Sequence, residues 1–164
     1  MASSPGYWLN PDSGLCLRVS THEMAVRNQA TATRLGLSEW AYADIMRLPA
    51  HDLDAIRLTA MHHGLVRIRD YRDHISIQFT CQRHRVRPIL WAVYEALASL
   101  KIWPDAPLLI TNLLLDDQVT ITLRNLHQKL RDDEQILREQ IDIPPDVPAN
   151  HPLLERWRSD LSSE

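Results

Sequence analysis

The chain has 164 residues, two cysteines and a formal net charge of −3 at pH 7, which is the size of one globular domain that does not need disulfide bonds to fold. Hydrophobic residues make up 45 % and charged residues 24 %, close to the soluble globular average, so a disordered or fibrous chain is excluded. No run of about 18 apolar residues occurs and the first residues do not resemble a secretion signal, so we expect no membrane span. We therefore expect a cytoplasmic protein in which Cys16 and Cys81 are free thiols.

Positive and negative charges are separated along the sequence. Residues 57–87 contain seven arginines and two aspartates, a net of +5, whereas residues 116–164 contain eleven acidic and six basic residues, a net of −5. A bipolar chain of this kind can bind a polyanion through its basic part, or bind a second copy of itself through opposite charges. The sequence leaves both alternatives open.

The N-terminal part predicts two short extended segments followed by a helix. Residues 7–9 form a short extended piece, and residues 15–19 alternate in hydrophobicity as a strand does. Ser20 and Glu23 have the spacing of a capping box, which predicts one helix over residues 21–35.

Two further helices are predicted before the middle of the chain. Ser38 caps the first, over residues 39–47, and Gly64 ends the second, over residues 52–63. The apolar face predicted for the first of them consists of Leu37, Trp40, Ala41, Ile45 and Leu48.

A β-hairpin over about residues 65–80 is the centre of the predicted fold. Apolar and polar side chains alternate strictly along both strands, so one face is apolar and the other carries polar residues such as Arg67 and Arg69. Two strands alone are marginally stable in water, and the amphipathic helix that begins at about Arg85 is the predicted cover. The hairpin sequence resembles hairpins of small bacterial proteins, a resemblance that implies no activity.

The C-terminal part predicts two strands, a long helix and an arm. Residues 108–111 form one strand, and the β-branched residues near 119–121 favour a second strand over a first helical turn. A helix follows over residues 122–140. The prolines of residues 143–148 require an extended linker, which leads to a short amphipathic helix with the apolar residues Leu153, Leu154, Trp157 and Leu161.

These elements predict an α+β fold in which a small antiparallel sheet, with the hairpin at its centre, packs against several helices. Residues 1–142 are predicted to form one domain, and residues 143–164 a proline-rich linker and a C-terminal helical arm. The arm either docks on its own chain or contacts another subunit, and the sequence does not choose between the two.

The sequence lacks several common catalytic motifs. Its four glycines (6, 14, 36 and 64) are far apart, which excludes a glycine-rich phosphate loop. His22 and Glu23 open a zinc-peptidase motif, but Val26 stands where the second histidine is required. No G-x-S-x-G segment occurs. We expect no cofactor, and a non-catalytic protein is favoured.

Histidine and cysteine chemistry remains as a catalytic alternative. His62, His63, His74 and His84 bind a metal only if the fold brings them together, and Cys81 lies three residues before His84, the spacing of a nucleophile and its base on a helix. No third, orienting group is identified. A His- or Cys-based hydrolase or metal enzyme is therefore the second alternative function.

Clustered arginines are the positive signal for binding. Guanidinium groups match the geometry of phosphate and carboxylate, and they supply the sequence-independent part of nucleic-acid affinity. We predict a basic face that consists of Arg67, Arg69, Arg72, Arg83, Arg85 and Arg87. In the alternative, these arginines pair with acidic residues of the same or a neighbouring chain, namely Asp132, Asp133, Glu134 and Glu139.

The sequence thus favours a soluble, non-catalytic protein of bacterial type that acts as a protein-interaction or self-association module. The contact is expected through the C-terminal arm or the arginine face, with a second copy or another protein as the partner. Nucleic-acid binding through the arginine-rich hairpin is the first alternative. No membrane partner is expected.

Overall fold

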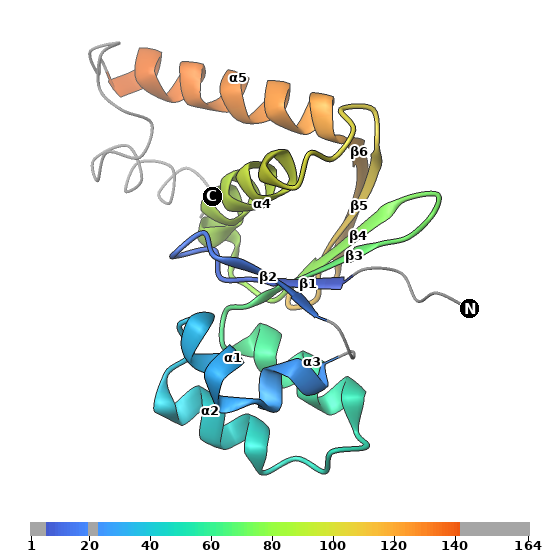
Figure 1. Ribbon diagram of the computed structural model, residues 1–164. Helices are drawn as coiled ribbons and strands as arrows, with labels where there is room; N and C mark the ends of the chain where they lie inside the picture. Colours follow the sequence, from blue (N-terminus) through green and yellow to red (C-terminus); the bar gives the residue numbers. More distant parts are fainter. Residues whose placement is uncertain (1–5, 20–22, 142–164) are drawn as a thin grey trace.

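The computed structural model describes residues 6–19 and 23–141, with side chains to residue 136. These residues form a six-stranded sheet covered by helices on both faces, α1, α2 and α3 below it and α4 and α5 above it in Figure 1. The strands are β1 (Gly6–Leu9), β2 (Cys16–Val19), β3 (Val66–Asp70), β4 (Ile75–Phe79), β5 (Pro107–Asn112) and β6 (Asp117–Thr122). The helices are η1 (Met24–Arg27), α1 (Gln29–Arg34), α2 (Glu39–Met46), α3 (Leu53–His62), η2 (Arg83–Arg85), α4 (Val86–Ser99) and α5 (Leu123–Ile141), where η marks a 3-10 helix.

The sheet is mixed rather than antiparallel. Its strand order is β2-β1-β3-β4-β5-β6, and each neighbouring pair is antiparallel except β4 and β5, which are parallel. Parallel neighbours need a long crossover connection, and α4 provides it by returning the chain to the end of the sheet where β4 began. The predicted α+β class is therefore confirmed, whereas the prediction of a small antiparallel sheet is only partly correct, because the sheet has six strands and one parallel pair.

The β3–β4 hairpin lies at the middle of the sheet, as predicted. Ile68 pairs with Ile77 across the two strands, and both side chains are buried under α4. The residues of α4 that contribute to this core recur at helical spacing along the face predicted to cover the hairpin, with Val93 and Leu97 fully buried. The apolar side chains that alternate along β3 and β4 therefore pack against apolar side chains that recur with the 3.6-residue period of α4.

A second core lies on the opposite face of the sheet, between β1 and the helices α1, α2 and α3. Its members include Trp8 of β1 and the buried residues Val26, Leu35, Ile45, Ile56 and Met61. Trp8 reaches this core because side chains alternate along a strand, so that its neighbours Tyr7 and Leu9 face the first core instead. The sheet is thus buried on both faces at its centre.

The prediction of one helix over residues 21–35 is wrong. The chain forms the short helix η1, and α1 then begins after Asn28, whose backbone is extended and whose side chain accepts a hydrogen bond from the N–H of Ala30 at 2.9 Å. An asparagine in this conformation ends one helix and caps the next. Ser20 lies outside the described residues, so the predicted capping box stays a prediction.

Helices α2 and α3 begin close to where they were predicted. The Ser38 hydroxyl accepts a hydrogen bond from the N–H of Ala41 at 3.1 Å, and α3 is followed by Gly64 in a left-handed conformation. One residue of the predicted apolar face is misplaced, because the Trp40 side chain is 80 % exposed. Ala41 and Ile45 face the core as expected.

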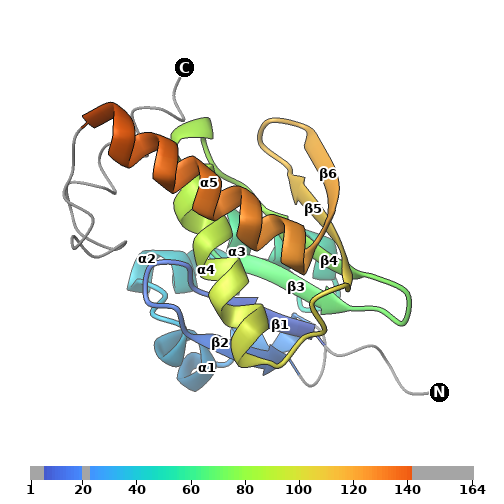
Figure 2. The same ribbon diagram turned by 90° about the horizontal axis from the view of Figure 1, so that it is seen from above.

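The predicted strand near residues 119–121 is confirmed as part of β6, and α5 follows it directly. Leu123, Leu126 and Leu130 of α5 are buried in the core that α4 shares, and Figure 2 shows α5 crossing over α4. No helix among the described residues is long and apolar enough to cross a membrane. Residues 143–164, including the predicted arm, lie outside the described residues.

Candidate functional site

The six arginines predicted to form a basic face lie on different sides of the molecule. Arg67 and Arg69 lie on the face of β3 opposite to Val66 and Ile68, next to α3. Arg87, in contrast, belongs to α4 on the other face, where its Nε is 3.6 Å from a carboxylate oxygen of Asp133 on α5. The structure therefore does not place all six arginines on one surface. Nucleic-acid or protein binding by these residues stays a prediction.

The other three of these arginines are exposed on the surface. Arg85 pairs with Asp12 at 3.0 Å, and Arg72 is exposed in the turn between β3 and β4. Arg83 is also exposed, in η2. The alternative prediction, in which these arginines pair with acidic residues of the same chain, is met by Arg87 and Asp133.

Arg67 is the centre of a buried cluster. Only 4 % of the residue is exposed, and its Nε donates a hydrogen bond to a carboxylate oxygen of Glu23 at 2.8 Å. Its guanidinium lies over the indole ring of Trp8, with the central carbon 5.5 Å from the ring centroid. A Cβ at Gly6 would lie 2.6 Å from Nη1, so the guanidinium lies close to the β1 backbone only because residue 6 is glycine.

The cluster contains more positive than negative charge. Burial lowers the pKa of Arg67, the Glu23 carboxylate raises it, and the nearby guanidinium groups of Arg69 and Arg57 lower it again. Arg57 reaches the cluster from α3, while its Nη2 pairs with the exposed Asp54 at 3.2 Å. Three guanidinium groups thus influence one another here, and the buried carboxylate of Glu23 pairs with one of them, Arg67.

Several donors in and beside this cluster are buried without a hydrogen-bond partner among residues 6–19 and 23–136. They are Nη1 of Arg67, Nε of Arg69, Nε of Arg57 and Nε1 of Trp8. Buried donors are paired in most proteins, because an unpaired one loses its hydrogen bond to water and gains nothing in return. We refer to Arg57, Arg67 and Arg69 together with Glu23 as the buried arginine cluster.

Sequence reasoning missed two parts of this cluster. Glu23 was assigned to a helix cap, and Gly6 had no predicted role. The roles of these two residues can be inferred only once β1 is known to pair with β3, because this pairing places Trp8 opposite Arg67. The sequence indicates the positive segment that contains Arg67, but Glu23, the partner of Arg67, lies 44 positions before it.

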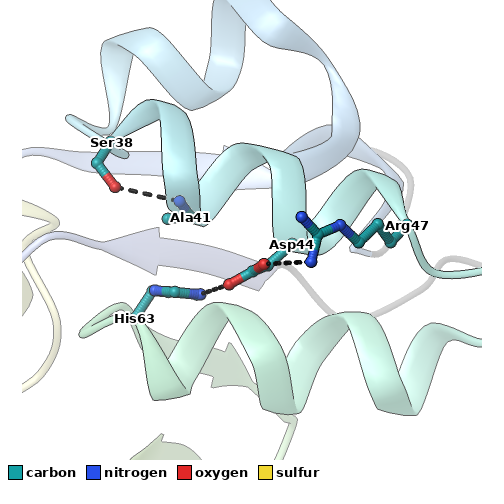
Figure 3. A network of polar contacts seen from close by, with 5 residues as sticks. All are labelled: Ser38, Ala41, Asp44, Arg47 and His63. Carbon is teal, nitrogen blue, oxygen red and sulfur yellow. Dashed lines mark hydrogen bonds and ion pairs between the residues drawn. The ribbon is translucent and has the colours of Figure 1, made fainter.

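A polar network connects α2 to the end of α3, as Figure 3 shows. Nε2 of His63 lies 3.0 Å from one carboxylate oxygen of Asp44, and Nη1 of Arg47 lies 3.3 Å from the other. Ser38 and His63 both line a hollow of about 170 Å³. The Ser38 hydroxyl caps its own helix at Ala41, and no hydrogen bond joins it to His63 among the described residues. Serine, histidine and aspartate therefore do not form a catalytic triad here.

The histidines singled out in the sequence do not gather into a metal site. His62 and His63 are neighbours, but His74 stacks on Tyr71 in the hairpin turn and pairs with Asp73 at 2.9 Å. Within residues 6–19 and 23–136, no three His, Cys, Asp or Glu side chains are grouped so that they could hold a metal ion.

Cys81 makes its described side-chain contact with Asn112. Its Sγ lies 3.7 Å from Nδ2 of Asn112, whose side chain also hydrogen-bonds the Cys81 backbone. Burial raises the pKa of the Cys81 thiol to about 11, although Arg85 and the Asn112 hydrogen bond lower it in part. Burial also raises the pKa of Cys16 to about 11. Neither thiol is activated at neutral pH.

Both cysteines should therefore react slowly with iodoacetamide in the folded protein. Relative to an ordinary thiol pKa of 9.0, a pKa near 11 reduces the thiolate fraction about a hundredfold. The more basic thiolate is about tenfold more nucleophilic, so the reaction rate falls by about tenfold in total. Alkylation at pH 8, followed by mass spectrometry, should be at least about tenfold slower than in urea-unfolded protein. Equal rates in folded and unfolded chains would contradict these environments.

The same shifts predict how stability changes at high pH. Because the folded-state pKa of each thiol lies above its unfolded value, the unfolded chain loses these protons first as the pH rises. The free energy of unfolding should therefore decrease between pH 9 and about pH 11.

The turn between β5 and β6 exposes three consecutive leucines. Leu113, Leu114 and Leu115 are 38 %, 54 % and 38 % exposed, at a position where hairpins usually carry glycine, asparagine or aspartate. Buried Asn112 holds this turn, since its Oδ1 accepts hydrogen bonds from the N–H groups of Leu114, at 3.2 Å, and Cys81, at 3.3 Å. We refer to residues 113–115 as the leucine turn.

The strand that follows the leucine turn forms one edge of the sheet. On its outer side, no strand pairs with β6 in the part of the chain that the structure describes. Val119 is half exposed, although it lies opposite buried Ile110 and on the face of the sheet where the main core lies. The apolar core therefore continues to an open edge.

Comparison of the chain with protein-family models, with curated proteins and with solved structures gives no match in any of the three, so its function is inferred from its own geometry.

Proposed function

We propose that this protein is a non-catalytic interaction module that self-associates through the leucine turn and the edge strand β6. The observation that carries the proposal is the leucine turn itself, an apolar hairpin loop exposed to solvent and held in one conformation by Asn112. A preorganised apolar loop loses little conformational entropy on binding, so most of its burial contributes to affinity. Exposed apolar residues that are contiguous in this way are typical of protein contact sites.

The edge strand supports the same conclusion. Natural edge strands are usually protected from pairing by lysine, proline, a bulge or an inward-pointing charge. In β6 the sequence from Asp117 to Thr122 contains one charge, at the first position, and neither proline nor lysine. A strand of this kind is suited to pair with a strand of another chain through main-chain hydrogen bonds.

A second copy of the chain is the partner that fits this edge. If two β6 strands pair antiparallel about a two-fold axis that passes through Thr120, each Val119 lies opposite Ile121 of the second copy and each Gln118 lies opposite Thr122. No like charges then face each other, and each half-exposed Val119 lies against the second copy. Closure by a two-fold axis leaves no unpaired β6 edge in the dimer.

Sedimentation velocity of the full chain tests the proposal. The wild type should associate in a concentration-dependent manner, and Leu114→Asp should weaken association by at least about tenfold, because burying one leucine contributes about 1.5–3 kcal/mol. Trp40→Asp is the matched control, since it places the same charge on an equally apolar and more exposed residue of α2.

The sedimentation experiment has one result that supports the proposed contact and two that contradict it. Association that Leu114→Asp weakens and Trp40→Asp does not would support the proposed contact. A monomeric wild type at all concentrations, or an equal effect of the two variants, would overturn it.

Nucleic-acid binding remains the alternative proposal, and fewer observations support it. Arg67 is buried, and Arg85 and Arg87 already pair with Asp12 and Asp133. Exposed Arg72 in the hairpin turn is the residue that best fits a phosphate contact.

A further inference from the structure

We propose that Arg57, Arg67 and Arg69 bind a small oxyanion, either a phosphate or a carboxylate group, between the sheet and α3. This site is independent of the leucine turn and of the proposed self-association. It follows from three features of the buried arginine cluster, namely its unpartnered donors, its charge and its access.

The donors are the first feature. Within the part of the chain that the structure describes, Nη1 of Arg67, which belongs to a residue 96 % buried, has no hydrogen-bond partner, and neither has Nε of Arg69 or Nε of Arg57. Glu23 occupies Nε of Arg67 at 2.8 Å and so leaves Nη1 for another acceptor. A group with several acceptor oxygens can satisfy donors from different side chains at once.

The charge is the second feature, and it distinguishes an anion from a water molecule. Of the described carboxylates that pair with these three guanidinium groups, Glu23 is buried against Arg67, whereas Asp54, which pairs with Arg57, is exposed and its charge is screened by solvent. Water could accept hydrogen bonds from the unpartnered donors but would leave the excess positive charge uncompensated. A bound oxyanion supplies both the acceptors and the charge.

Access is the third feature. Arg69 on β3 is half-buried and the Arg57 side chain on α3 is 30 % exposed, so both neighbours of buried Arg67 are partly open to solvent. The Arg69 guanidinium lies over the Tyr71 ring, with its carbon 5.5 Å from the ring centroid, and this contact orients the side chain. The ligand is therefore expected to enter between Arg57 and Arg69 and to reach Arg67 last.

The test is calorimetric titration of the full chain, with inorganic phosphate in one arm and malonate in the other, at an ionic strength kept constant with sodium chloride. We expect saturable binding of at least one of the two. Binding of phosphate alone would assign a phosphate ligand, binding of malonate alone a carboxylate ligand, and binding of both the shared oxyanion chemistry.

Substitutions of the cluster arginines test whether the anion binds at the proposed site. Arg69→Gln and Arg57→Gln keep side chains of similar length and should each weaken binding by about tenfold or more, because each removes a charge-assisted hydrogen bond. Arg72→Gln is the matched control in the exposed hairpin turn and should bind as the wild type does. The proposal is overturned if neither anion binds more than sodium chloride does, or if both cluster variants bind with unchanged affinity.

Discussion

Replacement of Arg67 by alanine should destabilise the protein by about 3–5 kcal/mol, the usual cost of removing one partner from a buried ion pair. The physical reason is that Glu23 would keep its charge in a site where Arg67 is its hydrogen-bonded partner, with both side chains more than nine-tenths buried. The loss of packing against Trp8 and the β1 backbone adds to this cost. Urea denaturation followed by tryptophan fluorescence measures the change.

Two companion variants identify the cause. Arg72→Ala removes an arginine from the exposed turn of the same hairpin and should change stability by less than about 0.5 kcal/mol. The double variant Arg67→Met with Glu23→Leu should recover most of the stability lost in Arg67→Ala, because an apolar pair of similar volume removes the unpaired charge. If Arg67→Ala cost less than about 1 kcal/mol, the buried ion pair would be contradicted.

Replacement of Ile77 by alanine should cost about 2–5 kcal/mol, because it opens a cavity in the middle of the main core. Ile77 is fully buried, pairs with Ile68 of β3 and Ile110 of β5, and belongs to the core beneath α4. Elements on three sides hold the site, so the surroundings can collapse into the cavity only in part. Thermal and urea unfolding should both report the loss.

The conservative variant Ile77→Val provides the matched control for this prediction. It removes one methyl group and should cost only about 0.5–1.5 kcal/mol. If Ile77→Ala destabilised the protein no more than Ile77→Val does, the hairpin would not be packed as the structure shows.

Local pattern explains which parts of this fold were predictable. Alternation along β3 and β4 and the helical spacing of α4 are properties of neighbouring residues, so the hairpin and its covering helix were predicted correctly. The break at Asn28 was not predicted, because asparagine in a helical context only weakly opposes the helix until its side chain finds a cap. The exposure of Trp40 depends on where α3 packs, which local pattern does not contain.

Long-range pairing explains what the sequence could not show about the site. The predicted basic face assumed that the polar side of the hairpin meets solvent, whereas β1 and α3 cover Arg67. That cover requires Gly6, Trp8 and Glu23, which lie more than 40 positions before Arg67 in the chain. Similarly, the parallel pairing of β4 with β5 follows from the path of α4 and not from the residues of either strand.

The proposed contact is tested most directly by hydrogen exchange of the full chain at low and high protein concentration. Self-association through β6 predicts slower amide exchange at high concentration across residues 113–122, with the exchange of α1, α2 and α3 unchanged. Exchange across residues 113–122 that is the same at both concentrations, or slowing confined to other elements, would contradict the account.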